Sequence, residues 1–88
     1  MAVKAGSSRA LKCVVRRGMF SDERVVIVSR PDGETESFFV PISMVNETRS
    51  TVRVEVAKKN GAPGTLVALQ TAEGEACVLV RSSDIEQG

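Results

Sequence analysis

The sequence predicts an all-β fold: a small six-stranded barrel or tight sandwich made of two three-stranded repeats related by a pseudo-twofold axis. Three observations favour this class. The chain has 88 residues, enough for one modest core. It contains three Phe, no Tyr and no Trp, so aliphatic residues led by Val must build that core, and Val packs well on a pleated sheet. Short apolar runs, several of them alternating with polar residues, are separated by Gly- and Pro-containing segments.

The first expected strand covers residues 9–17. Leu11, Cys13 and Val15 alternate there with residues that include Lys12 and Arg16. Successive side chains of a strand point to opposite faces, so these three share one face. We expect this face to point into the core.

A hairpin follows. Residues 23–30 contain four consecutive apolar, β-branched residues, which is typical of a strand buried on both faces. Pro31, Asp32 and Gly33 predict a turn, because Pro presets the backbone and Gly accepts the left-handed conformation. Residues 35–40 return as the partner strand.

The second half of the chain shows the same succession of expected strand, loop and hairpin. Residues 50–58 alternate most regularly, with valines expected inward and Arg53 and Glu55 expected outward. The Gly- and Pro-rich segment 60–64 predicts a loop. Residues 65–71 and 75–81 then predict a second hairpin.

Each hairpin is followed by a segment too short for a regular helix. Residues 43–47 are expected to form a single helical turn capped by Ser43. Ser83 and Glu86 have the spacing of a capping box, so a similar turn is expected at the end of the chain.

These parallels predict an internal repeat, with one copy at about 9–48 and the other at about 49–88. The halves align at an offset of 41 residues up to the hairpin turns, as when Leu11 falls on Val52, and at an offset of 40 after them. Fixed-period similarity is the mark of a repeated supersecondary unit. A three-stranded unit cannot bury its apolar face alone, so two units are expected to pack together. An SH3-like barrel with an extra N-terminal strand is the alternative. The identical pairs are Val15/Val56, Val26/Val67, Gly33/Gly74, Glu34/Glu75, Val40/Val80 and Ser43/Ser83.

The composition argues against catalysis and against a metal or cofactor. The chain has no His, which removes the commonest general base and metal ligand. Cys13 and Cys77 do not form a metal-binding pair and are expected to be small buried hydrophobes. No run is apolar and long enough to cross a membrane, and residues 1–8 predict a flexible tail before a single domain over 9–88. We expect a cytoplasmic protein that is not an enzyme.

Met19 and Phe20 lie in the first loop, where the second copy has Asn60 and Gly61. Two large apolar residues in a loop either close the end of the barrel, which we favour, or bind a partner. The first copy is also bulkier and more apolar than the second, with Phe38 and Phe39 where the second copy has Val78 and Leu79. We therefore predict a non-catalytic interaction module that binds a protein partner or a second copy of itself, with Met19 and Phe20 as candidate contact residues.

The alternative function is nucleic-acid binding. Residues 1–30 hold seven basic residues and two acidic ones, although the net charge of the chain is only +1. Basic pairs end the matching strands of the two copies, and such pairs can track phosphates. Few aromatic residues are present to stack on bases, which weakens this hypothesis. The candidate residues are Arg16, Arg17, Arg24, Lys58 and Lys59.

Overall fold

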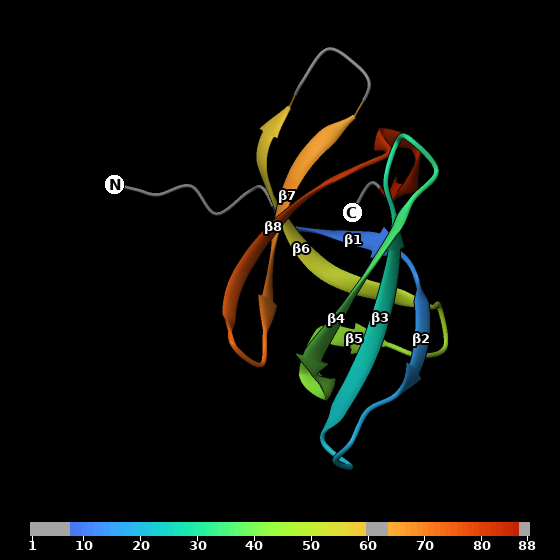
Figure 1. Cartoon of the computed structure of the whole chain (residues 1–88), viewed down its shortest axis with the longest axis vertical. Helices are drawn as coiled ribbons and strands as arrows, with labels where there is room; N and C mark the ends of the chain where they lie inside the picture. Colours follow the sequence, from blue (N-terminus) through green and yellow to red (C-terminus); the bar gives the residue numbers. More distant parts are fainter. Residues whose placement is uncertain (1–7, 60–63, 87–88) are drawn as a thin grey trace.

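The computed structural model of the chain describes residues 8–59 and 64–86. This part of the chain folds into nine strands and two single turns of 3-10 helix (Figure 1). The first strand already begins at Ser8, the last residue of the predicted tail. The elements in chain order are β1 (Ser8–Lys12), β2 (Val14–Arg17), β3 (Glu23–Ser29), β4 (Thr35–Pro41), η2 (Ile42–Met44), β5 (Val45–Asn46), β6 (Thr51–Lys59), β7 (Thr65–Thr71), β8 (Gly74–Val80), η3 (Ser82–Asp84) and β9 (Ile85–Glu86).

The strands form two antiparallel sheets, so the prediction of a closed barrel is wrong. One sheet has the order β8-β7-β6-β1-β9, with β5 also paired to β6; the other has the order β2-β3-β4. The predicted strand over 9–17 is divided between the two sheets, because the chain leaves the larger sheet at Cys13. The Cys13 N–H still donates to the Ser50 carbonyl at 3.0 Å, in register with the β1–β6 pair, and from Val14 onward the chain pairs with β3. A small two-sheet, sandwich-like β fold results.

The centre of the larger sheet is the antiparallel pair β1 and β6, in which Leu11 lies opposite Val52. The two shortest strands pair across the halves of the chain. Val45 of β5 lies opposite Val52 on β6, and Ile85 of β9 lies opposite Leu11 on β1. The last strand of each half is therefore hydrogen-bonded to the first strand of the other half.

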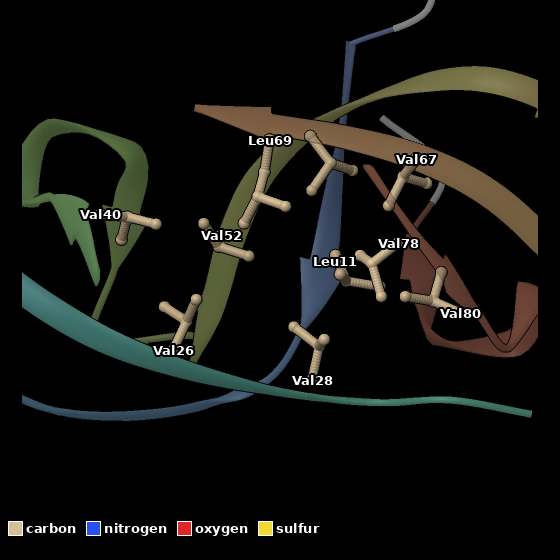
Figure 2. Close-up of a cluster of buried hydrophobic side chains, with 10 residues drawn as sticks. Leu11, Val26, Val28, Val40, Val52, Val67, Leu69, Val78 and Val80 are labelled. Atoms are coloured by element: carbon tan, nitrogen blue, oxygen red, sulfur yellow. The ribbon is translucent and has the colours of Figure 1, made fainter. Parts of the chain in front are cut away.

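The hydrophobic core fills the space between the two sheets (Figure 2). Val26 and Val28 point from β3 toward the β1–β6 pair, and Val40 joins them from β4. Leu11 is fully buried, with Cys13 and Val15 packed against the core, so the predicted face of this segment is confirmed. The prediction that 23–30 is buried on both faces is wrong, because only alternate residues of β3 are fully buried. The buried cluster is Leu11, Val26, Val28, Val40, Val52, Val54, Val67, Leu69, Val78 and Val80.

The hairpins β3–β4 and β7–β8 match the predicted ones, and their turns differ by one residue. Arg30 donates its N–H to Glu34 across a three-residue loop, whereas Thr71 pairs directly with Gly74 across a two-residue loop. Gly33 and Gly74 both have positive φ, 92° and 118°, which explains a Gly in each turn. Equivalent ladder positions are therefore Glu34 and Gly74, and the predicted Glu34/Glu75 match is not kept in the ladder.

The short helical turns form as 3-10 turns, but their predicted caps are wrong. Ser43 and Ser83 lie inside the turns, each of which begins one residue earlier. The capping positions are Pro41 and Arg81, both in extended conformation, and neither makes a side-chain cap. The 3-10 turn thus serves to turn the chain into β5 or β9.

Among residues 8–59 and 64–86, one backbone hydrogen bond links the β7–β8 turn to the smaller sheet. The N–H of Ala72, in the β7–β8 turn, donates to the Phe39 carbonyl of β4 at 2.8 Å. The corresponding position in the β3–β4 turn is Pro31, which has no N–H to donate. Pro31 instead lies against Gly64, where a built Cβ would be 2.9 Å from the proline Cγ. The link between the sheets is therefore present on one side only.

Candidate functional site

The loop between β2 and β3 presents its two large apolar side chains to solvent. Met19 is 81% exposed and Phe20 is 65% exposed, so the favoured prediction that they close the end of the fold is wrong. Glu23 holds the loop in this shape: its carboxylate accepts the Met19 N–H at 3.1 Å, and its own N–H donates to the Phe20 carbonyl at 3.1 Å. Gly18 lies against the Glu23 carbonyl and leaves no room for a Cβ, at 2.9 Å.

The outer face of the β2–β3–β4 sheet is also apolar. Because Val26, Val28 and Val40 point into the core, the alternate residues of these strands point away from it. Val14 and Phe39 are about half exposed there, at 48% and 49%. We call this surface the outer face; its members are Val14, Arg16, Val25, Ile27, Ser37 and Phe39.

The loop and the outer face border one hollow of about 320 Å³. Phe39 and Ser37 line it from β4, and Met19 and Phe20 line it from the loop. Glu73, in the β7–β8 turn, also lines it. The Ala72–Phe39 hydrogen bond holds that turn against β4.

The exposed apolar residues are distributed unevenly between the halves of the chain. All large hydrophobic side chains that are exposed among the described residues lie between residues 14 and 42. At the position matching Val14 the second half has Glu55, which is exposed, and at the position matching Ile27 it has Ala68, which is buried. The sequence indicated this asymmetry in Phe38 and Phe39 but not in Val14. The signal for Val14 was its alternation with Leu11, Cys13 and Val15, which requires it to face outward.

The two basic pairs of the alternative function follow opposite ends of the β1–β6 ladder, and the side chains of Lys58 and Lys59 lie outside the described part of the structure. Arg16 and Arg17 are exposed at the end of β2, and no carboxylate pairs with them within the described residues. Arg24 is held by Glu47 in an ion pair and also donates to the Ser21 and Glu23 carbonyls. The β1–β6 register carries the two basic pairs away from each other: residues 16–17 follow its Lys12/Thr51 end, and residues 58–59 follow its Ser8/Glu55 end.

The two cysteines are free and differ in environment. Cys13 is half-buried against the core, and burial raises the pKa of its thiol to about 11. Cys77 is exposed, so the prediction that it is a buried hydrophobe is wrong. At the first hairpin, the Glu34 N–H and the Arg30 guanidinium lower the pKa of Asp32. The carboxylates of Asp32 and Glu36 stabilise the turn, because both pair with the Arg30 guanidinium. The Arg30–Glu36 distance is 2.9 Å.

Comparison of the chain with protein-family models, with curated proteins and with solved structures gives no match. Within the described residues, no helix is long and apolar enough to span a membrane. The outer face and the loop beside it are therefore the features from which we infer a function.

Proposed function

We propose that this chain is a small non-catalytic β module that binds another polypeptide through the outer face and the Met19–Phe20 loop. The observation that carries the proposal is that the exposed large apolar side chains of the described residues all lie between residues 14 and 42, and three of them, Met19, Phe20 and Phe39, border one hollow. Scattered apolar residues are normal on a protein surface, but a contiguous apolar patch bordered by polar groups marks an interaction site. Here Val14 and Phe39 lie on one sheet face, with Arg16 beside them and Glu73 lining the hollow.

The second half of the chain provides an internal comparison. Ser37 and Cys77 are equivalent positions on β4 and β8, since each pairs with the equivalent residue of the preceding strand, Ile27 or Ala68. Both are small and exposed. Only Ser37 borders the apolar hollow, so only Ser37 is expected to lie close to a bound partner.

The proposal can be tested in cells that produce the chain. A photo-crosslinking amino acid is placed at Ser37 and, as the matched control, at Cys77. We expect covalent adducts with a polypeptide from position 37 and none from position 77. Phe39→Asp, combined with the probe at 37, is expected to abolish the adduct while the circular dichroism spectrum stays unchanged. Equal adduct yields from both positions, or none from 37, would contradict the proposal.

We also propose that the two halves are copies of one unit related by a pseudo-twofold axis. The pairing registers support this: Val26 lies opposite Phe38 and Val67 opposite Val78, which is the same pair at offsets of 41 and 40. The cross-pairings of β5 with β6 and of β9 with β1 correspond in the same way. A circular permutant with the halves exchanged, joined by a flexible linker, is expected to unfold at nearly the urea midpoint of the natural order. A permutant opened inside the β3–β4 ladder is the control and is expected to be less stable.

A further inference from the structure

We propose that the polypeptide bound by the outer face is a second copy of this chain, paired face to face about a twofold axis, with Arg16 of each copy against Glu73 of the other. This inference rests on the proposed function and names its partner. It follows from how charge is arranged on either side of the apolar surface.

The residues form a row across the smaller sheet. Arg16 lies opposite Val25, and Val25 lies opposite Phe39. The Phe39 carbonyl accepts the Ala72 N–H, and Glu73 is the next residue. With strands about 4.8 Å apart, the row runs roughly 15 Å from a cation at one end, across two apolar residues, to a carboxylate at the other.

The charges at the two ends of this row are free to bind elsewhere. Arg16 and Glu73 have no ion-pair partner within residues 8–59 and 64–86, whereas Arg24, Arg30, Arg49 and Arg81 are each paired with a carboxylate. Both residues are exposed. Their side chains are thus available to a partner, with no internal ion pair to break.

A twofold pair requires a surface that is complementary to itself, because the same patch is used by both copies. The row meets this requirement. A rotation about an axis through its apolar middle, between Val25 and Phe39, exchanges its ends and brings each arginine over the glutamate of the other copy. A surface with one sign of charge at both ends would repel its own copy.

The alternative pairing, edge to edge through β2, is disfavoured by charge. β2 ends in Arg16 and Arg17, so joining two β2 edges gathers four guanidinium groups around one short ladder. Charged residues on a short edge strand are a common protection against such pairing. The face, and not the edge, is therefore the surface through which two copies associate.

Charge reversal on the full chain tests the proposal by light scattering and sedimentation over a range of concentrations. The wild-type chain, whose monomer is 9.4 kDa, is expected to double in mass as its concentration rises. Arg16→Glu and Glu73→Arg, taken singly, each create two repulsive contacts per pair and are expected to raise the dimer Kd at least about tenfold. The double variant R16E/E73R is expected to regain the wild-type Kd. An equimolar mixture of the two single variants is expected to form a heterodimer, because both of its contacts are again attractive.

Matched reversals at exposed sites away from the row are the controls. Arg53→Glu, on the outer side of the larger sheet, and Glu34→Arg, at the first hairpin, are expected to leave the Kd unchanged. Equal effects from these controls, or no rescue in the double variant and in the mixture, would overturn the proposal. A wild-type chain that stays monomeric up to about 1 mM would also overturn it. If position 37 still crosslinks to a different protein in that case, the proposed function stands and only its partner is wrong.

Discussion

Leu11 and Val52 lie directly opposite each other in the β1–β6 ladder, and each is the residue that corresponds to the other in the two halves of the chain. This pairing is what the proposed twofold relation between the halves predicts for the β1–β6 ladder. Both side chains are essentially fully buried.

We expect Leu11→Ala to lower the free energy of unfolding by about 3 kcal/mol, because truncating a buried Leu removes apolar contact and leaves a cavity. Urea denaturation followed by circular dichroism measures this. Val14→Ala, three positions along the chain on the exposed outer face, is the control and is expected to change stability by less than about 0.5 kcal/mol. Equal losses in both variants would contradict the assignment of the two faces.

The Ala72–Phe39 hydrogen bond predicts an effect of proline in the second hairpin. Ala72→Pro gives that turn the residue found at the corresponding Pro31 and removes the donated N–H. We expect a loss of about 1–3 kcal/mol, since the Phe39 carbonyl loses its hydrogen-bond donor. Ala72→Ser retains the N–H and serves as the control in the same thermal unfolding experiment. If both variants unfold alike, the bond does not stabilise the contact between the sheets.

Two glycines are expected to tolerate alanine very differently. A Cβ on Gly64 would lie 2.2 Å from the Val80 carbonyl oxygen, so Gly64→Ala must displace backbone and is expected to cost more than about 2 kcal/mol. Gly33→Ala meets nothing within 4 Å and has only the positive φ to overcome, which costs roughly 1 kcal/mol. Chemical denaturation of the two variants side by side gives the comparison. A smaller loss at Gly64 than at Gly33 would contradict it.

The cysteines are expected to react in sequence with a thiol reagent. Cys77 is exposed and should react at neutral pH, as judged by mass spectrometry of the alkylated chain. Cys13 has a pKa of about 11 in the folded chain, so at pH 8 roughly one thiol in a thousand is a thiolate. Its rate is expected to rise about tenfold per pH unit up to that pKa, and Cys77→Ser isolates it.

The raised pKa of Cys13 also makes the free energy of unfolding depend on pH, because the ordinary pKa of a Cys is 9.0. Between pH 9 and 11 the unfolded chain loses this proton while the folded chain keeps it, so stability falls as the pH rises through that window. Cys13→Ala is expected to remove this part of the pH dependence. An identical decline with and without Cys13 would contradict the assignment.

The positions of the strands along the chain can largely be predicted from the sequence, because a local pattern of residues marks each strand. The alternation in β6 and the Pro31-Gly33 turn are local signals, and both appear as expected. The division of residues 9–17 is not local, since its two parts pair with different strands: Leu11 lies opposite Val52 on β6, and Val15 lies opposite Val26 on β3. The closed barrel failed for the same reason: closure depends on how two sheets meet, and no residue pattern within a strand specifies that.

The candidate site was predicted in part. Met19 and Phe20 could be identified as candidate contact residues because large apolar residues are unusual in a loop. Their exposure depends on Glu23, which holds the loop outward. Phe38 and Phe39 were recognised as a difference between the halves, and alternation alone leaves open which of the two faces solvent. Only the sheet register, which places Phe39 beside Val25, assigns it to the outer face. Glu73 could not be linked to this face from sequence, because a hydrogen bond between turns and sheets brings it there.

The crossed pairing of β5 with β6 and of β9 with β1 also governs when the protein can fold during its synthesis. Both partners of β1, namely β6 and β9, belong to the second half of the chain. While only the first half has left the ribosome, β1 has no strand to pair with. The core-facing side chains of the first half are then exposed to solvent. We expect the larger sheet to form only after β6 and β9 have been synthesised, and the charged residues of the first half to oppose its aggregation until then.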